Sequence, residues 1–331
     1  MNRYQRLLSF CEKNQLSYDL AIESHDLLRG AHGGEIAGVS VEQEDFSQGE
    51  VKTVKILTEE GAHKMKKPIG TYITISSPAL MINNRRQHQE LMEVIAQKLN
   101  SICPLNEQDL VLVAGLGNRR ATLDALGPRL SDKILATRHL HGRVPEEILE
   151  GVRPVATLAP GVLGVTGIET AEMIKAIVKL IKPHLLIVCD ALAAGDVSRI
   201  GSTIQISDAG INPGAGLGNE RTQVNQATIG IPVVAVGVPT VVNGVVLAHN
   251  ILESFLEQLQ NTPHFAQMSE DIPPIIFEHS IKETIKPYSN NLTVTPKEID
   301  DLIENAANVI AQSISSYLHP EMNKAFAEIF I

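Results

Sequence analysis

The sequence contains few cysteines and few basic residues. Its three cysteines, Cys11, Cys103 and Cys189, are too few and too scattered for a disulfide framework or a four-ligand zinc site. The 28 Lys and Arg are outnumbered by 38 Asp and Glu, and the formal net charge of -10 disfavours binding to the phosphates of DNA or RNA. We therefore expect a protein of the reducing cytoplasm that has no direct nucleic-acid partner.

Segments that would direct the chain to or across a membrane are also lacking. Residues 1–14 carry charges around only a few apolar residues and have no long apolar stretch, so we expect no export. Residues 222–252 contain no Asp, Glu, Lys or Arg and are long enough to span a bilayer. Prolines and glycines divide this segment into short Val-rich pieces, however, which favours buried strands over a membrane span.

Apolar residues, in contrast, are plentiful: they make up 44% of the 331 residues, enough for at least one full-sized core. Residues 20–80 are rich in strand-like runs. Residues 85–260 alternate amphipathic helices with continuous apolar strands, a pattern typical of a mostly parallel sheet with helices on both faces. We therefore predict an α/β fold with a mostly parallel sheet flanked by helices and with extra N-terminal strands.

The expected elements can be placed along the chain. Strands are expected at 18–23, 36–41, 51–57, 72–75, 110–114, 155–159, 185–189, 203–206 and 231–236, and helices at 85–102, 123–136, 170–181 and 247–259. The C-terminal part, 261–331, is expected to hold a connector at 261–291 and a helix at 296–317. Thr295 is the expected N-cap of that helix.

Familiar catalytic motifs are missing. We find no Gly-x-Ser-x-Gly, no His-Glu-x-x-His and no phosphate-binding loop of nucleotide triphosphatases. The turn Gly115-Leu-Gly-Asn118 follows an expected strand, but Arg120 stands where a dinucleotide-binding turn has its third glycine, so a tight turn is favoured over cofactor binding. His139 and His141 are a weak alternative site, for a metal ion. Loop histidines can contribute to a metal site but are more often solvated or structural.

Two aspartates are better candidates for catalysis. Asp190 directly follows the apolar strand expected at 185–189, and open α/β sheets bind ligands at such strand ends. Asp124 falls in the opening turn of the helix after the first turn motif. If the two strands are neighbours, both carboxyls face one crevice, where one can hold a proton while the other stays charged. Helix-terminal and turn roles are the alternatives for these residues.

Ten short motifs follow one another along most of the chain. They are Tyr18-Asp-Leu-Ala-Ile-Glu23, Thr58-Glu-Glu-Gly61, Gly115-Leu-Gly-Asn118, Asp124-Ala-Leu-Gly-Pro128, Thr137-Arg-His139, Pro160-Gly-Val-Leu-Gly-Val-Thr-Gly-Ile-Glu-Thr170, Asp190-Ala-Leu-Ala-Ala194, Thr203-Ile-Gln-Ile-Ser-Asp208, Gly230-Ile-Pro-Val-Val-Ala-Val-Gly237 and Val294-Thr-Pro-Lys-Glu298. Together they resemble the spore germination protease family, endopeptidases of spore-forming bacteria that degrade small acid-soluble spore proteins when the spore germinates.

The resemblance implies an α/β core similar to that of hydrogenase-maturation proteases, a homotetramer, and a precursor that removes its own N-terminal segment. The aspartates assigned to catalysis in this family match Asp124 and Asp190. Family processing sites place an acidic residue before an apolar one and then a small one, which matches the bond Asp19–Leu20. The chain would thus consist of a propeptide, 1–19, and a single peptidase domain, 20–331. Its substrates would be small acid-soluble spore proteins in the cytoplasm of the forespore or the spore core.

Two alternatives stay open beside this hypothesis. Ser17-Tyr18 stands where the family usually has Arg-Thr before the acid, which leaves room for a spore protein that binds peptides without cutting them. The other alternative is a protease of the same fold in which Asp124, Asp190 and a histidine hold a divalent metal that activates water. The leading hypothesis is an aspartate-dependent endopeptidase that needs no cofactor.

Overall fold

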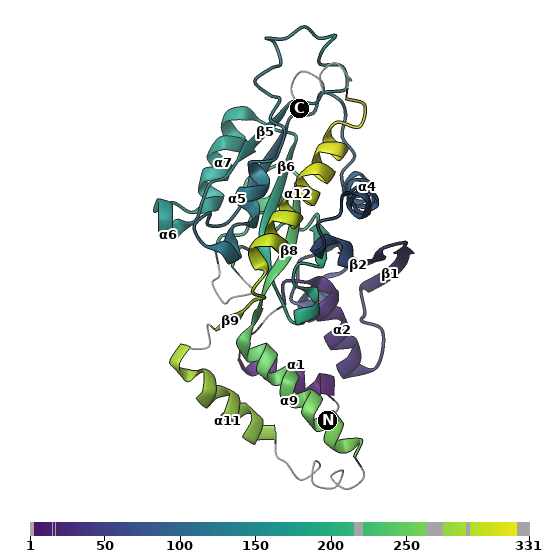
Figure 1. Cartoon of the computed structure of the whole chain (residues 1–331), viewed down its shortest axis with the longest axis vertical. Helices are drawn as coiled ribbons and strands as arrows, with labels where there is room; N and C mark the ends of the chain where they lie inside the picture. Colours follow the sequence, from purple (N-terminus) through teal and green to yellow (C-terminus); the bar gives the residue numbers. More distant parts are fainter. Residues whose placement is uncertain are drawn as a thin grey trace.

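The computed structural model describes residues 3–14, 16, 18–214, 221–262, 274–288 and 292–322. Within these residues, nine strands form one sheet in the order β1-β2-β3-β7-β8-β6-β4-β5, and β9 pairs with the C-terminal end of β8. Helices cover both faces of the sheet, and a helical arm extends beyond one end of it (Figure 1). Ser17, which carries the departure from the family motif, lies outside the described residues.

The centre of the sheet is parallel. β4 (Val111–Gly115) lies between β5 (Val155–Leu158) and β6 (Leu185–Ala194), and β6 also pairs in parallel with β8 (Val233–Asn243). All residues of β4 and β8 are buried, because helices or other segments cover both faces of these strands. The strands predicted between residues 85 and 260 are all present, with β6 and β8 longer than expected.

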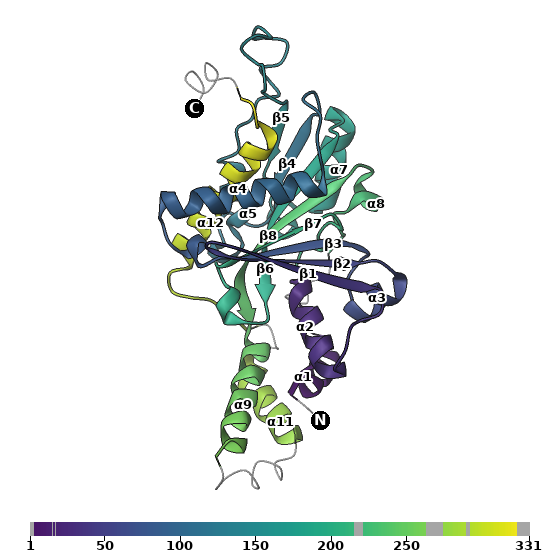
Figure 2. The same cartoon turned by 90° about the vertical axis from the view of Figure 1, so that its right-hand side faces the viewer.

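The N-terminal strands belong to the same sheet and are antiparallel. β1 (Val39–Phe46), β2 (Gly49–Ile56) and β3 (Gly70–Ser76) form a meander, and β3 pairs with β7 (Thr203–Ser207) (Figure 2). β7 and the short β9 (Thr293–Val294) are both antiparallel to β8. Parallel pairing is therefore limited to the core β5-β4-β6-β8, and the other five pairings among the described strands are antiparallel. The α/β fold with extra N-terminal strands is confirmed, while the mostly parallel pairing that the sequence predicts holds only for that core.

Two helical layers bury the faces of the core. One face carries α4 (Arg85–Ile102), α5 (Leu126–Ser131) and α12 (Ile299–Leu318), and the other carries α7 (Thr170–Ile181) and α8 (Gln226–Ile229), with α6 (Leu163–Thr166) just before α7. Successive residues of β6 point to opposite faces. Ile187 packs in the cluster under α12, and Val188 packs in the cluster under α7.

The arm beyond the sheet is helical. It consists of α9 (Gly244–Gln260) and α11 (Pro274–Ile285), with α1 (Arg3–Lys13) against α9 and α2 (Ala21–His32) leading back to the sheet (Figures 1 and 2). Phe10 packs with Val245, Ile281 and Ile285. The remaining short elements are α3 (Glu59–Met65) and 3-10 turns at Pro78–Met81, Thr122–Asp124, Val197–Arg199 and Lys286–Tyr288.

The strand predicted at 18–23 is wrong. This segment is the entry to α2, which begins at Ala21, and Leu20, Ala21 and Ile22 are all fully buried. A short apolar run of this kind fits either a buried strand or the first turn of a buried helix. Here the segment forms a helix start because its apolar residues pack in the core against β2 and β3.

Two other predicted elements differ at their ends. The helix expected at 123–136 is a 3-10 turn followed by the short α5. The helix expected at 296–317 begins at Ile299 with Glu298 as its N-cap. The hydroxyl of Thr295, the predicted N-cap, instead donates to the Thr240 carbonyl oxygen (2.8 Å).

The expected connector 261–291 contains α11, whose Pro274 is compatible with a first helical turn. The charge-free segment 222–252 forms α8, β8 and part of α9. No helix in the described parts of the chain combines the length and the apolar character needed to cross a bilayer.

Candidate active site

A cavity of about 410 Å³ opens beside the carboxyl end of β4. Asp124 and Asp190 both line it, together with Asp19 from the N-terminal segment. The loop that contains α6 contributes further lining residues, from Val162 to Thr170. The structure thus brings together the two aspartates predicted from the sequence, because β4 and β6 are neighbours in the sheet.

Asp124 is the last residue of the 3-10 turn that follows β4. The Asn118 N–H donates to Oδ2 of Asp124 (2.8 Å) and to its main-chain oxygen (2.9 Å). From β8, the Thr240 hydroxyl donates to the Leu123 carbonyl oxygen (2.7 Å). Gly117 has a φ of +111°, and a methyl group on it would lie 2.1 Å from the Asp124 carbonyl oxygen. The tight turn therefore fixes Asp124 against the end of β4.

The first turn of α5 lies directly on the sheet. A Cβ on Gly115 would be 1.9 Å from the Gly127 carbonyl oxygen, and a Cβ on Gly127 would be 2.2 Å from the Leu116 carbonyl oxygen. Leu116 donates to the Cys189 carbonyl oxygen (2.8 Å), one residue beyond the last paired residue of β4. Glycine at both positions allows this approach, which brings the turn with Asp124 close to β6.

Asp190 lies inside β6, and not after its end as the sequence predicted. The neighbouring β4 ends at Gly115, opposite Cys189, so Asp190 is the first β6 residue without a partner on that side. The strand continues to Ala194 because β8 still pairs with it. Asp190 is 5% exposed, and its Oδ1 accepts a hydrogen bond from the Ala191 N–H (2.9 Å).

The two carboxyls differ in their electrostatic environment. Burial raises the pKa of Asp190 well above its usual range, and the negative charges of Asp124 and Asp19 add to the effect. Burial also raises the pKa of Asp124, but the hydrogen bond from Asn118 opposes that shift. Such a pair can hold one proton on Asp190 while Asp124 is charged.

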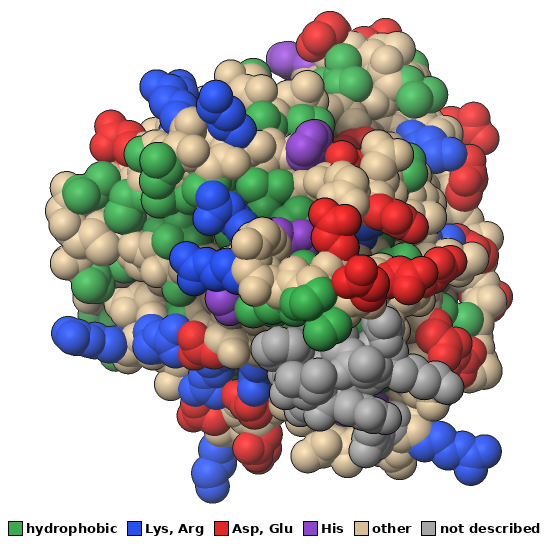
Figure 3. Space-filling view, turned by 90° about the horizontal axis from the view of Figure 1, so that it is seen from above, with side chains coloured by type: hydrophobic (Ala, Val, Ile, Leu, Met, Phe, Trp, Pro, Cys, Tyr) green, Lys and Arg blue, Asp and Glu red, His purple; other side chains and the backbone are tan. Residues whose placement is uncertain are grey.

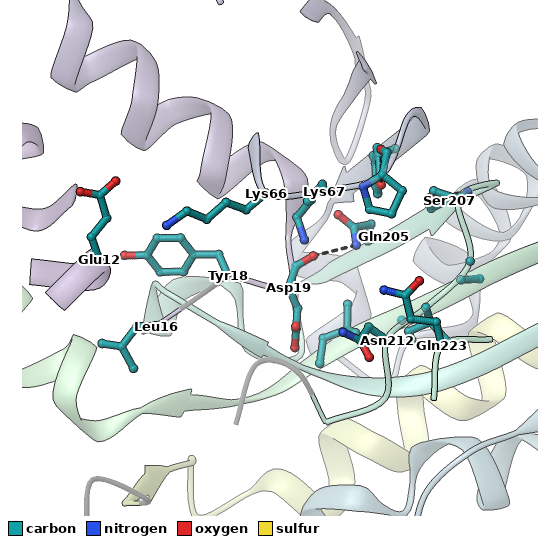
Figure 4. Close-up of a pocket in the computed structure, with 18 residues that line it drawn as sticks. Glu12, Leu16, Tyr18, Asp19, Lys66, Lys67, Gln205, Ser207, Asn212 and Gln223 are labelled. Carbon is teal, nitrogen blue, oxygen red and sulfur yellow. Dashed lines mark hydrogen bonds between the residues drawn. The ribbon is translucent and has the colours of Figure 1, made fainter. Parts of the chain in front are cut away.

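Asp19 also lines a second cavity, of about 730 Å³, whose lining residues are drawn in Figure 4. Asp19 and Leu192 line both cavities. The Asp19 carboxylate accepts a hydrogen bond from the Ala193 N–H (2.8 Å), and its carbonyl oxygen accepts one from Nε2 of Gln205 (3.1 Å). Oε1 of Gln205 accepts from the Ala21 N–H (2.7 Å). The predicted processing bond, which follows Asp19, therefore lies where the two cavities meet.

Sequence reasoning did not single out Gln205 or Glu23. Gln205 is a buried amide in a strand whose neighbours are apolar or hydroxyl residues, and that isolated polar position was the available signal. Glu23 accepts hydrogen bonds from the Gly195 N–H (3.0 and 2.9 Å) and forms an ion pair with Arg199 (3.3 Å). Burial raises the pKa of Glu23 to about 7. Both residues tie α2 to the sheet.

The two histidines suggested as metal ligands lie far from the aspartates. His139 is exposed and His141 is partly buried, and their loop hydrogen-bonds to Val155 at the amino end of β5, opposite the candidate site. Figure 3 views the molecule from that end and shows basic and acidic side chains gathered on different sides of the face. Among the residues that the structure describes, no three His, Cys, Asp or Glu side chains are arranged to hold a metal ion.

The chain is similar to known germination proteases over most of its length. The family model described as germination protease matches residues 18–274 and 276–331. A germination protease of Clostridium perfringens strain 13 is 43% identical over 309 residues, which cover 92% of this chain and 95% of that protein. The germination protease of Priestia megaterium is 36% identical over 349 residues, which cover 92% of this chain and 94% of that protein.

The solved structures include one match to a hydrogenase maturation protease. It is the [NiFe] hydrogenase maturation protease HycI from Thermococcus kodakarensis, which covers 67% of this chain and 98% of its own. The TM-score is 0.35 and the sequence identity is 17%.

Proposed function

Because this chain belongs to the germination protease family and is a protease, we propose that it is an aspartate-dependent endopeptidase that degrades small acid-soluble spore proteins during germination. The observation that carries this proposal is the position of Asp124 and Asp190 in one cavity, beside the point where β4 ends against β6. Two further observations support it: burial raises the pKa of Asp190 well above its usual range, and the hydrogen bond from Asn118 favours the charged form of Asp124.

In the proposed reaction the two carboxyls divide the proton transfers between them. The charged Asp124 takes a proton from a water molecule, and the resulting hydroxide attacks the carbonyl carbon of the peptide bond. Asp190 donates its proton to the carbonyl oxygen as the tetrahedral intermediate forms. As the intermediate collapses and the C–N bond breaks, Asp124 gives the proton that it took from water to the leaving nitrogen. Asp190 takes back a proton from a hydroxyl of the intermediate, which becomes the new carboxyl group, and the starting protonation of the pair is restored.

We further propose that residues 1–19 are a propeptide that the enzyme removes by cutting Asp19–Leu20. The location of Asp19 at the boundary of both cavities supports this proposal. So does the docking of α1 on α9, which holds the N-terminal segment on the helical arm. A segment held in this way would keep the protease silent until it is released.

Assembly and location follow from the family resemblance alone. We propose a homotetramer in the forespore cytoplasm or spore core. Light scattering should give a particle of four times the 35.9 kDa chain mass. A monomeric particle at working concentration would contradict the tetramer without affecting the dyad.

Single substitutions test the dyad. Asp124→Asn and Asp190→Asn should each abolish cleavage of a small acid-soluble spore protein, while circular dichroism shows a folded chain. Asp45→Asn is the matched control, because Asp45 lies on the exposed edge strand β1. Full activity in either dyad variant would remove the proposed mechanism.

A further inference from the structure

We infer that Gln205 is a peptide-binding residue whose side-chain amide holds the main chain across the bond that is cut. In the intact chain, Nε2 donates to the carbonyl oxygen of Asp19 and Oε1 accepts from the N–H of Ala21. The amide therefore brackets Leu20 on both sides. The carbonyl that Nε2 contacts belongs to the predicted processing bond, so this inference rests on the proposed function.

Gln205 lies in the same row of the sheet as Asp190. Gln205 pairs with Gly237 of β8, and Gly237 pairs with Asp190 of β6. Residues paired in this way point to the same face of the sheet. Two strand spacings place the main chains of Gln205 and Asp190 roughly 10 Å apart. Their side chains can therefore approach one extended peptide from opposite sides.

Gly237, the residue between them, leaves room on this face of the sheet for the side chain of Leu192. Gly237 has no side chain, and a Cβ there would lie 2.6 Å from Cδ1 of Leu192. Leu192 thus lies over the glycine and lines both cavities. Asp19 crosses the same boundary, with its carboxylate bonded to the Ala193 N–H and its carbonyl bonded to Gln205. The main chain at residue 19 is consequently placed between the amide and the dyad cavity.

A purely structural role for Gln205 would need only its side-chain oxygen, and not its NH2 group. Ala21 is the first residue of α2, and Leu20, its N-cap, makes no side-chain capping bond. Oε1 of Gln205 therefore satisfies a free N–H of the helix start. Nε2, in contrast, bonds to residue 19, which leaves with the propeptide. In the processed chain this buried N–H would point into the larger cavity and would bind the carbonyl oxygen of an incoming peptide.

The cavity beside Gln205 fits a peptide with an acidic residue before the cut bond. Lys66 and Lys67 line it together with Asp19, and Figure 4 shows the Lys67 amine pointing toward Asp19. Burial lowers the pKa of Lys67, and the charges of Asp19 and Glu23 oppose that shift. After Asp19 has left, the same cavity would accept the acidic side chain that precedes the cut bond of a substrate peptide.

Gln205→Glu separates the two halves of the amide, because it keeps an acceptor for the Ala21 N–H and removes the donor. The full-length variant is followed by mass spectrometry for loss of residues 1–19. Its processed fraction is then assayed on a small acid-soluble spore protein. We expect slower self-processing and a kcat/KM reduced roughly 100-fold, the size of effect seen when a donor to a reacting carbonyl is removed. Gln97→Glu, an equal charge change on the exposed side of α4, should behave like the wild type.

A second variant keeps the inference testable if Gln205→Glu does not fold. Gln205→Asn retains the amide but is one methylene shorter, and it should slow both reactions while thermal unfolding confirms a native chain. Wild-type rates in the folded variants would overturn the inference and leave only the structural role. A wild-type cut at a bond other than 19–20 would overturn it as well. Failure of the proposed function is distinguishable, because the wild type would then leave spore proteins intact or the dyad variants would cut them.

Discussion

Arg6 of α1 and Glu253 of α9 form a two-pronged ion pair, with Nε 2.9 Å from Oε1 and NH2 2.6 Å from Oε2. Glu253 is 5% exposed, so the pair is shielded from solvent on the carboxylate side. Nearby, the rings of Phe10 and His249 lie 4.5 Å apart. These contacts attach the N-terminal segment to the arm.

Arg6→Met should loosen α1. Loss of the guanidinium leaves the buried carboxylate of Glu253 without this partner, at a cost of roughly 3 kcal/mol. Hydrogen exchange of the amides of residues 3–13 should become faster. Lys64→Met is the control, because the Lys64–Glu60 pair on α3 is exposed and should contribute little to stability. Equal exchange in α1 of both variants would contradict the prediction.

Gly117→Ala should inactivate the protease. The new methyl group would collide with the Asp124 carbonyl oxygen and displace the turn, and misplacement of a catalytic group by about 1 Å can cost roughly 100-fold in rate. Steady-state cleavage of a spore protein measures the loss. Gly142→Ala provides the comparison, since Gly142 also has a positive φ (+78°) but has open space around it. That variant should lose about 1–2 kcal/mol of stability and keep its kcat/KM.

Glu23 should make the folded chain less stable as the pH rises from about 4.5 to about 7. Its pKa is raised from 4.5 to about 7 by burial, so in this range the folded chain binds more protons than the unfolded chain. The free energy of unfolding should fall by on the order of 3 kcal/mol across this pH range, so the folded chain is most stable at its acidic end. Urea unfolding of the wild type and of Glu23→Gln at several pH values measures it. Parallel pH profiles for the two proteins would show that Glu23 has no such effect.

Dialysis against a chelator should leave the activity unchanged. In the proposed mechanism Asp124 and Asp190 activate water without a metal, so removal of divalent ions takes away no reacting group. Cleavage of a spore protein before and after dialysis is the measurement. Lasting inactivation that zinc or another divalent ion reverses would favour the metal-dependent alternative.

The strands of the parallel core could be predicted because burial on both faces leaves an uninterrupted apolar run in the sequence. The same signal placed Asp124 and Asp190 after two of these strands, but it could not show that the two strands are neighbours in the sheet. It could not show that β6 continues past Asp190, because the β8 pairing that extends the strand is a long-range contact. Local sequence likewise could not separate a strand from a helix start at Leu20.

Gln205 illustrates the limit of reasoning from one segment at a time. Its partners are residues 19 and 21, more than 180 positions away in the chain. No spacing within β7 reveals that its amide meets another part of the main chain. Only the three-dimensional placement of the N-terminal segment makes this residue a candidate for peptide binding.

Thr240 links three parts of the molecule through one residue. Its hydroxyl donates to the carbonyl of Leu123, next to Asp124, and its own carbonyl accepts from the hydroxyl of Thr295, just before α12. The turn that carries Asp124 and the segment just before α12 are thus hydrogen-bonded to the same residue of β8. Only the contact to Leu123 depends on the side chain at position 240, so a serine, which keeps the hydroxyl, should be the replacement that the fold tolerates best.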